Sequence, residues 1–317
     1  MVKAPLITVL MPVYNCAGYL REAMDSVLQQ TCGDFEFLII NDGSTDESES
    51  IIQSYTDVRI KLVNQKNGGV SSALNNGLAL SKGKYIARFD ADDICYPSRL
   101  AEQLAFMESH PDYVMVGSDA DYVSEEGAFI FSYENTGHTH EEISAKIYQR
   151  NPLIHSAVFF IKSVIMQAGC YDLGAHTFED HLLWVKVIKM GKVCNLKKPL
   201  IKVRLNPASV TTDERLRGKR FLDLRQNILE RGDVVREEES KELLSIIRQQ
   251  AGNNTKVLGY HLFVAKKYLW NNYRPLLARR HIWRAMKLKP FSTDVWVLFF
   301  LSFMPKIVVV KLYEVMK

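Results

Sequence analysis

Apolar, β-branched runs alternate with segments of helical periodicity along the first third of the chain. A short continuous apolar run is typical of a strand buried on both faces, and apolar residues at helical spacing are typical of an amphipathic helix. The expected strands are 6–13, 35–40, 60–63 and 85–89, and the expected helices are 19–28, 44–55, 70–80 and 97–109. The alternation predicts a mostly parallel, open α/β sheet with helices on both faces, and such sheets bind ligands at the carboxyl ends of their strands.

The pattern changes in the rest of the chain. Further strands are expected at 114–123, 158–161, 193–196 and 201–205, and a helix is expected at 180–190. From about residue 213 onward the strand signals stop, and helical patterns cover 216–231, 237–250 and 256–288. We therefore predict an α/β domain over residues 1–212 and a helical C-terminal region over residues 213–317.

Composition and charge narrow the class of protein. Of 317 residues, 47% are apolar and 24% charged, which is the balance of a chain that buries a core. The net charge of +4 gives no strong basic field, so we expect no nucleic-acid partner. The five cysteines are widely spaced without a C-x-x-C pair, which favours free thiols in a reducing compartment. No signal peptide is evident at the N-terminus, and we expect a cytoplasmic protein.

Carboxylates cluster directly after two of the expected strands. Asp42 and Asp46 follow the second strand, and Asp90, Asp92 and Asp93 follow the fourth. One interpretation is that these residues make turns and helix caps. The other is a cation site, because neighbouring carboxylates repel one another unless a cation offsets their charge. Hard oxygen ligands suit Mg²⁺ or Mn²⁺ bound to a phosphate-bearing substrate.

The turns at the strand ends exclude several nucleotide-binding classes. No G-x-G-x-x-G follows the first strand and no Walker A loop is present, which argues against a dinucleotide dehydrogenase and a P-loop NTPase. The Gly-rich basic loop of a sugar-nucleotide pyrophosphorylase is also missing. Asn67-Gly68-Gly69 precedes the third expected helix, where it serves either as a backbone N–H cradle for a diphosphate or as a plain helix entry.

Seven motifs occur in an order that resembles the inverting family 2 glycosyltransferases of the GT-A fold. The resemblance spans about residues 5–211. The motifs are Pro12-Val13-Tyr14-Asn15, Asn41-Asp42-Gly43-Ser44-Thr45-Asp46, Asn67-Gly68-Gly69, Asn75-Asn76-Gly77, Asp90-Ala91-Asp92-Asp93, Asn151-Pro152-Leu153-Ile154-His155-Ser156 and Phe178-Glu179-Asp180-His181. The resemblance implies a GT-A catalytic domain over residues 1–212 and transfer of a sugar from a nucleotide-sugar donor.

The same resemblance implies a role for each matching position. The residues that line or approach the nucleotide are Pro12, Tyr14, Asn15, Asn67 and Gly69. Asp42 matches the residue that recognises the base, which is usually uracil. Asp90 matches the carboxylate near ribose and diphosphate, and Asp92 matches the one that holds Mn²⁺ or Mg²⁺. Asp180 matches the catalytic base, with Glu179 as the rival base, and His155 matches a position on the acceptor side.

The chain departs from the pattern of the family at three positions. Leu74 stands where many relatives have an Arg that reaches the diphosphate, and Asn206 stands where many have His. Asn41 replaces a frequent Asp. Arg204 is therefore expected to supply positive charge to the substrate. Neither Asp92 nor Asp180 is lost, so we expect an active enzyme.

The basic C-terminal segment bears on the acceptor. Residues 256–317 hold twelve basic and two acidic residues, and an apolar run at 296–304 follows five of the basic ones. One hypothesis is peripheral contact with the inner face of the cell membrane, and the other is a helix that packs back on the catalytic domain. Pro305 and Lys306 interrupt the run and argue against a spanning helix. Membrane contact fits a lipid-linked saccharide acceptor, which the resemblance also implies.

The donor and the activity leave alternatives open. A UDP-sugar is the first expectation for the donor, and a GDP- or dTDP-sugar is the alternative. The chain is expected to be a hexosyltransferase of cell-surface polysaccharide biosynthesis, including lipopolysaccharide or capsule. A hypothesis from another class is a non-catalytic sugar-nucleotide-binding subunit of a polysaccharide assembly complex.

Overall fold

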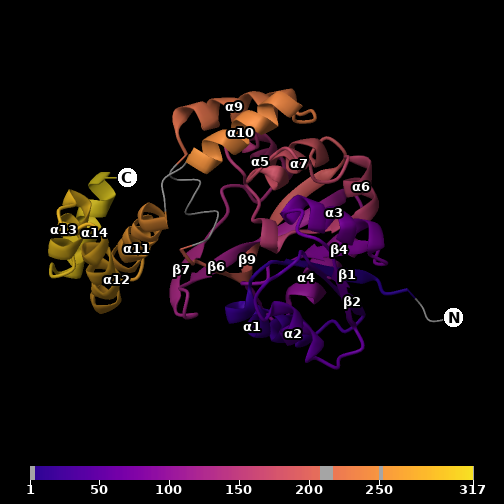
Figure 1. The fold of residues 1–317 in the computed structure, drawn as a ribbon, viewed down its shortest axis with the longest axis horizontal. Coiled ribbons are helices and arrows are strands. Elements are labelled where there is room, and N and C mark those ends of the chain that lie inside the picture. The colour runs from indigo at the N-terminus through magenta and orange to yellow at the C-terminus, as the bar shows by residue number, and fades with distance from the viewer. Residues whose placement is uncertain (1–3, 208–216, 250–252, 317) are drawn as a thin grey trace. The chain divides into compact units, whose positions relative to one another are not determined.

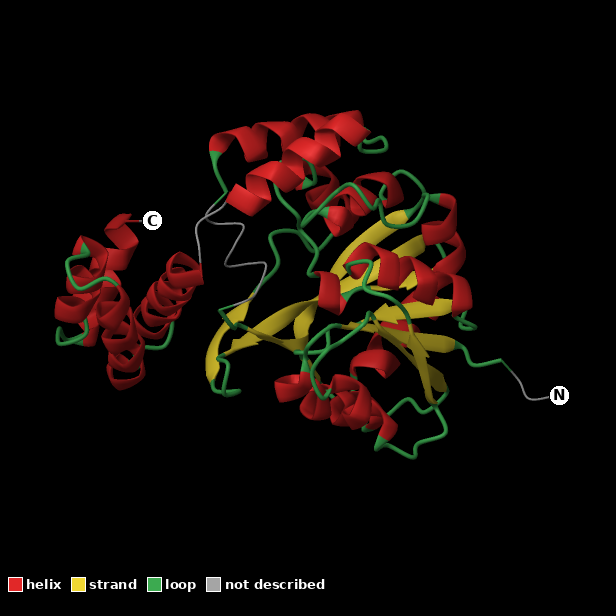
Figure 2. Cartoon of the chain, in the orientation of Figure 1, coloured by secondary structure: helices red, strands yellow, loops and turns green. Residues whose placement is uncertain are grey.

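A computed structural model describes residues 4–207, 217–249 and 253–316 of the chain (Figure 1). Its centre is a nine-stranded sheet with the order β3-β2-β1-β4-β8-β6-β9-β5, in which β7 pairs with β6. Both the strands and the helices of this α/β arrangement are visible in Figure 2. Helix α3 lies on one side of the sheet, and α1 and α2 lie on the other (Figure 1).

The first half of the sheet is parallel, as the sequence predicts. It consists of β1 (Ile7–Val13), β2 (Phe35–Asn41), β3 (Ile60–Asn64) and β4 (Tyr85–Arg88), with parallel register between neighbours. β1, β2 and β4 are almost wholly buried, which explains their continuous apolar sequences. The carboxyl ends of β1, β2 and β4 therefore meet at one edge, where the conspicuous turns follow.

The second half of the sheet is antiparallel. β8 (Phe159–Ile161) pairs antiparallel with both β4 and β6 (Tyr113–Val123), and the short β5 (Ile94–Cys95) pairs antiparallel with β9 (Lys192–Arg204). The sequence does not distinguish these strands from parallel ones, because both kinds read as apolar runs when buried on both faces. The short strands β5 and β7 (Phe129–Tyr133) were not expected from the pattern.

The expectation of two strands at 193–196 and 201–205 is wrong, because β9 is one continuous strand. Its middle residues, Lys197 and Lys198, are exposed, so their polarity reflects solvent contact and not the end of a strand. Lys198 forms an ion pair of 2.6 Å with Glu102. β5 pairs with the second half of the strand at Ile201 and Lys202.

Most helices of the α/β region lie where the periodicity places them. These are α1 (Ala17–Leu28), α3 (Val70–Leu80), α4 (Arg99–Ser109) and α7 (Glu179–Val187). α2 (Ser48–Gln53) is shorter than the expected helix 44–55, because Ser44 and Asp46 accept hydrogen bonds from the backbone N–H groups of Asn15 and Ala17. Two helices, α5 (His140–Lys146) and α6 (Lys162–Gln167), and the 3₁₀ turn His155–Ala157 were not expected.

The chain divides into two compact units, which are described here separately. The first comprises Met1–Ala120, Tyr133–Val203 and Arg220–Leu244, and the second comprises Asp121–Ser132, Arg204–Lys219 and Ser245–Lys317. Helix α9 (Lys219–Arg231) and most of α10 (Glu237–Gln249) thus belong with the sheet. The domain boundary predicted near residue 213 and the start of the helix expected at 216 lie outside the described residues.

The second unit contains the C-terminal helices α11 (Asn253–Trp270), α12 (Pro275–Leu288), α13 (Thr293–Leu301) and α14 (Lys306–Met316). The segment 256–288 is helical, as expected, and it forms two helices, α11 and α12. Tyr273 adopts a positive φ of 46°, and Pro275 starts the next helix, where its missing N–H costs no hydrogen bond. In the described part of the chain, no helix has the length and apolar character needed to cross a bilayer.

Gly83 offers a test of how tightly the chain is packed where it enters β4, beside β1. A Cβ added there would lie 2.4 Å from the backbone N of Thr8 and 2.6 Å from the backbone C of Ile7. We expect Gly83→Ala to lower the free energy of unfolding by about 3 kcal/mol, because the backbone must shift. Gly33→Ala is the matched control, since nothing lies within 4 Å of its added Cβ. Equal denaturation midpoints for the two variants would contradict the expected clash.

Candidate active site

The turns after β1 and β2 are tied together and carry the first group of predicted residues. Asn15 has a positive φ of 51°, its N–H donates to Ser44 Oγ at 3.1 Å, and its Oδ1 accepts from the Thr45 N–H at 2.8 Å. Pro12 is half-buried, whereas the ring of Tyr14 is 50% exposed. An exposed aromatic ring held on a fixed turn is suited to stacking against a planar ligand.

Asp42 lies at the end of β2 and organises the glycine turn. Its Oδ1 accepts hydrogen bonds from Gln65 Nε2 at 2.7 Å and from the Gly68 N–H at 2.9 Å. Its Oδ2 accepts from the Gly69 N–H at 2.9 Å, and Gly69 has a positive φ of 84° at the N-terminus of α3. The carboxylate is only 3% exposed. It therefore compensates the positive end of the helix dipole.

This arrangement decides between the two interpretations of the glycine turn. The N–H groups of Gly68 and Gly69 donate to Asp42, so the structure favours the helix entry over the diphosphate cradle. Asn67 lies against the turn after β2. The approach is so close that a Cβ added to Gly43 would be 2.8 Å from the backbone N of Asn67. The structure thus brings Asn67 and Gly69 beside Asp42, and their contact with a nucleotide stays a prediction.

Asp90 and Asp92 lie at the end of β4. Asp90 forms an ion pair with Arg88 Nη1, and its backbone N–H donates to Ser156 Oγ at 3.1 Å. Asp92 is half-buried. Burial raises the pKa of the Cys16 thiol, which follows β1, to about 12, and the negative charges of Asp92 and Asp90 add to the shift. The ends of β1 and β4 therefore meet in one negatively charged region.

The donor chemistry of this region fits a divalent cation. In the described ranges, no group of three or more His, Cys, Asp or Glu side chains is arranged to hold a metal. Mg²⁺ and Mn²⁺ in nucleotide enzymes need no such group, because one or two carboxylates and the substrate phosphates supply the oxygens. Asp90 and Asp92 both bring negative charge to this region, so the donor set fits the metal, and the assignment of the metal to Asp92 stays a prediction.

Asp180 occupies the first turn of α7, where two donors fix its carboxylate. Asn151 Nδ2 donates to Oδ2 at 2.7 Å, and the His181 N–H donates to Oδ1 at 2.6 Å. Burial raises the pKa of Asp180 above the usual Asp value, while the His181 N–H, Arg88 and Asn151 oppose the shift and Asp90 adds to it. Glu179 precedes it and is 9% exposed. A carboxylate with a raised pKa is a candidate for proton transfer.

Arg88 is a further candidate site residue, which the sequence did not single out. Its guanidinium is 3% exposed, pairs with Asp90, and has a buried Nε without a hydrogen-bond partner. Its positive charge opposes the rise in the pKa of Asp180 and helps to lower the pKa of His155. Arg88 therefore connects the carboxylates after β4 with the one on α7. Its position two residues before Asp90 was the available signal.

His155 belongs to a buried aromatic cluster near Asp180. Its Nε2 lies 2.9 Å from the hydroxyl of Tyr171, and burial together with Arg88 keeps its pKa well below the usual value, so the ring is neutral at pH 7. Asn75 fixes Tyr171 by bonding both its carbonyl at 2.8 Å and its N–H at 2.9 Å. Trp184 is fully buried against these rings, which gives it a core-packing role.

Arg204 makes its described hydrogen bonds in the second unit. Its Nη1 donates to the carbonyls of Glu125 at 2.9 Å and Ser124 at 3.4 Å, and the side chain is 3% exposed. These contacts hold the turn between β6 and β7. The contribution of Arg204 to substrate binding stays a prediction.

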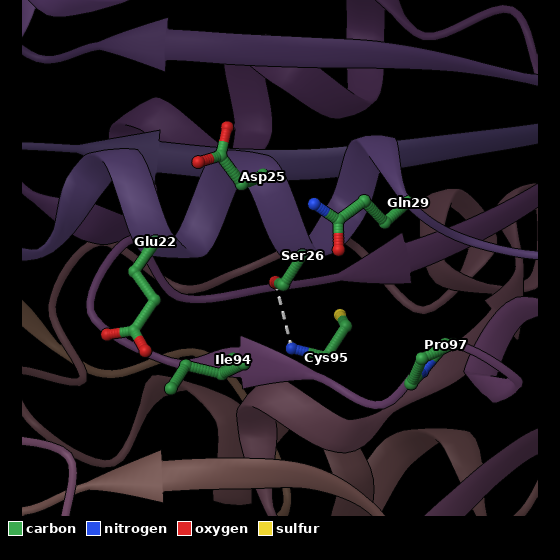
Figure 3. Close-up of a pocket in the computed structure, with 7 residues that line it drawn as sticks. All are labelled: Glu22, Asp25, Ser26, Gln29, Ile94, Cys95 and Pro97. Atoms are coloured by element: carbon green, nitrogen blue, oxygen red, sulfur yellow. Dashed lines mark hydrogen bonds between the residues drawn. The ribbon is translucent and has the colours of Figure 1, made fainter.

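A pocket of 410 Å³ lies between α1 and the segment that contains β5 (Figure 3). Its lining residues are Glu22, Asp25, Ser26, Gln29, Ile94, Cys95 and Pro97. Ser26 Oγ accepts from the Cys95 N–H at 3.0 Å, as the dashed line in Figure 3 shows. None of the predicted site residues lines it. We therefore assign the candidate active site to the strand-end cluster, which consists of Tyr14, Asn15, Asp42, Asp90 and Asp92 after β1, β2 and β4, together with Asp180 on α7.

Comparison with known proteins decides the family. The family model described as "Glycosyl transferase family 2" matches residues 8–167, a span that contains the turns after β1, β2 and β4. The chain belongs to glycosyl transferase family 2. This glycosyltransferase is 30% identical over 234 residues to an uncharacterised glycosyltransferase of Rickettsia prowazekii, a match that covers 73% of each protein. It is 32% identical over 205 residues to the amylovoran biosynthesis glycosyltransferase AmsE of Erwinia amylovora, covering 63% of this chain and 76% of AmsE.

Solved structures confirm the GT-A type of α/β fold. Residues 1–349 of TarS from S. aureus, solved in complex with UDP, match with a TM-score of 0.55 at 17% identity, covering 90% of both chains. The mannosyltransferase PcManGT of Pyrobaculum calidifontis, in complex with GDP-Man and Mn²⁺, matches with a TM-score of 0.55 at 17% identity. That match covers 95% of this chain and 86% of PcManGT. The predicted fold class is confirmed, and so is the predicted family.

Proposed function

We propose that this family 2 glycosyltransferase is an inverting hexosyltransferase that moves a sugar from a UDP-sugar to a saccharide or lipid-linked oligosaccharide. The observation that carries the proposal is the environment of Asp180. Two N–H donors fix its carboxylate, its pKa is raised by burial, and the charges of Arg88 and Asp90 act on it. Inversion in one displacement needs one base and no covalent sugar intermediate, which suits a single carboxylate in this setting.

In the proposed mechanism, Asp180 accepts the proton of the acceptor hydroxyl as its oxygen attacks the anomeric carbon. Asn151 and the His181 N–H hold one carboxylate oxygen each, so the lone pairs that remain have a fixed direction. Glu179 remains the rival base. Neutral His155, bonded to Tyr171, lines the acceptor side without competing for the proton.

The donor is proposed to bind across the ends of β1, β2 and β4. Pro12, Tyr14 and Asn15 would line the nucleotide, Asp42 would recognise the base, and Asp90 would approach the ribose and diphosphate. Asn67 and Gly69 would lie close by, and Arg204 would add positive charge. Asp92 would hold Mn²⁺ or Mg²⁺, and the metal would act as a Lewis acid that stabilises the leaving diphosphate.

Two comparisons support the choice of substrates. TarS was solved with UDP and with UDP-GlcNAc, whereas PcManGT was solved with GDP-Man, so the donor proposal keeps GDP-sugars, along with dTDP-sugars, as the alternative. AmsE is named for amylovoran biosynthesis, which supports a saccharide acceptor in a biosynthetic pathway. We also propose that transfer takes place at the cytoplasmic face of the membrane, where lipid-linked saccharides are presented.

Calorimetric titration of the protein with UDP-, GDP-, dTDP- and CMP-sugars, with Mn²⁺ present, tests the proposal. We expect one UDP-sugar to bind more tightly than the others and EDTA to weaken its binding. Tighter binding of a GDP- or dTDP-sugar would replace the donor assignment and keep the activity. A donor that binds but is never turned over with any saccharide acceptor would favour the non-catalytic assembly subunit.

Arg88 gives this mechanism a pH test. Replacing it by Met removes the positive charge that lowers the pKa of Asp180, so that pKa should rise further. Because the base must be deprotonated, the acidic limb of the kcat/KM profile should move to higher pH. We expect a shift of about one pH unit, with Arg88→Lys restoring most of the original profile. An acidic limb that does not move in Arg88→Met would contradict the assignment of that limb to Asp180.

A further inference from the structure

The C-terminal helices present an aromatic face to solvent, defined by Trp283, Trp296, Phe299, Phe300 and Phe303. Ring centroids lie 6.1 Å apart for Trp283 and Phe299, 5.7 Å for Trp296 and Phe299, and 5.1 Å for Phe299 and Phe303. The face is therefore continuous between α12, α13 and the residues after α13. Phe300 and Phe303 are 60% and 59% exposed, and Trp283 is 56% exposed.

This exposure does not come from a poorly packed helix. The opposite side of α13 buries Val295, Leu298 and Leu301 in the second unit. The end of the helix is fixed by Arg279, whose Nη2 donates to the Ser302 carbonyl at 2.7 Å and whose guanidinium lies 3.8 Å above the Phe303 ring. A helix that is apolar on both sides needs a second apolar environment for its outer side.

The charge around the aromatic face is positive. Arg280 and Lys287 are exposed three residues before and four residues after Trp283 on α12, so they share its side of the helix. Lys289 and Lys306 are exposed in the segments before and after α13. Between Lys256 and Lys317, only Asp294 and Glu314 are acidic. Exposed aromatic rings among cations complement the interface of an anionic bilayer.

We propose that the aromatic face inserts into the interfacial layer of an anionic lipid bilayer and docks the enzyme there. This proposal deepens the proposed function, because it supplies the surface that would bring the catalytic unit to a lipid-linked acceptor. The rings enter the boundary between headgroups and acyl chains, while the cations contact the lipid phosphates. Since no described helix is long and apolar enough to span a bilayer, the contact is peripheral.

The test is sedimentation of the full chain with vesicles of phosphatidylcholine alone or mixed with phosphatidylglycerol. We expect binding to the mixed vesicles, a blue shift of tryptophan fluorescence, and quenching by brominated acyl chains. Phe300→Ser with Phe303→Ser should weaken binding at least about tenfold, because each ring loses its transfer from water to the interface. Lys287→Glu with Lys289→Glu should weaken binding to the mixed vesicles by about tenfold, and added salt should do the same.

Val58→Ser is the matched control, because Val58 is an 85% exposed apolar residue of the first unit. It should bind vesicles as the wild type does. Equal melting temperatures would show that the Phe variant is folded. Absence of vesicle binding by the wild type, or unchanged binding by the Phe variant, would overturn the proposal. A wild type that is dimeric and a Phe variant that is monomeric, with neither bound to lipid, would also overturn it and assign the face to a second copy.

Nucleotide-sugar binding measured on the same samples separates the two proposals. Donor binding by the Phe variant at the wild-type level, together with lost vesicle binding, supports both. If the wild type binds no nucleotide-sugar donor, the proposed function is overturned and the result with vesicles is unaffected.

Discussion

Asp180→Asn is expected to reduce sugar transfer by roughly 10³-fold, because the amide cannot accept the proton of the acceptor hydroxyl. Nucleotide-sugar binding should stay within about twofold of the wild type, since the substitution preserves the size of the side chain and leaves the strand-end turns untouched. The measurement is the initial rate of product formation at saturating donor, together with the calorimetric Kd for the donor.

Glu179→Gln is the matched control for this variant, because Glu179 is adjacent in sequence and was the rival base. We expect its rate to fall by less than about tenfold. A larger loss in Glu179→Gln than in Asp180→Asn would reverse the assignment of the base. Unchanged transfer by both variants would contradict base catalysis from the start of α7.

Asp92→Ala is expected to remove the metal stimulation of transfer and to reduce kcat/KM by about 10²-fold or more, since a divalent cation supplies several kcal/mol of charge stabilisation. Donor affinity with Mn²⁺ should fall to the level measured for the wild type in EDTA. The reason is that Asp92 is the proposed metal ligand, whose half-buried carboxylate brings negative charge to the ends of β1 and β4.

The control for Asp92 is Asp112→Ala. Asp112 is half exposed and pairs with Lys192 at 2.8 Å on the surface, so its removal should change neither metal dependence nor donor affinity. An Asp92→Ala enzyme that keeps the full stimulation by Mn²⁺ would exclude Asp92 as the ligand. An enzyme with the same rate in EDTA and in Mn²⁺ would exclude a metal requirement altogether.

The sequence was sufficient to predict those strands and helices whose burial produces a clear apolar pattern. β1 and β2 are apolar runs because both faces are covered, and the α3 bounds Val70–Leu80 follow from a glycine at one end and loss of periodicity at the other. The antiparallel pairing of β8 was not predictable, because strand direction depends on how the chain returns to the sheet. The exposed Lys197 and Lys198 likewise hid the continuity of β9.

The strand-end carboxylates could be found from sequence because they are consecutive or follow strands directly. The charges and hydrogen-bond donors that surround these carboxylates could not be found from the sequence. Asp42 accepts hydrogen bonds from the backbone N–H groups of residues 68 and 69, and Arg88 acts on Asp180 from a position 92 residues earlier in the chain. The first relation arises where the end of β2 meets the start of α3, and the second where the end of β4 comes near the start of α7. The pairing of Tyr171 with Asn75 and His155 has the same origin.

Release of nucleotide from the donor that binds in calorimetry tests the central claim most directly. The wild type should release UDP from a UDP-sugar in Mn²⁺, slowly with water and faster with a saccharide acceptor, and EDTA should stop both reactions. Asp180→Asn should bind the same donor without release. A wild type that neither binds nor consumes any UDP-, GDP-, dTDP- or CMP-sugar would contradict the claim that the strand-end cluster is a glycosyltransferase active site.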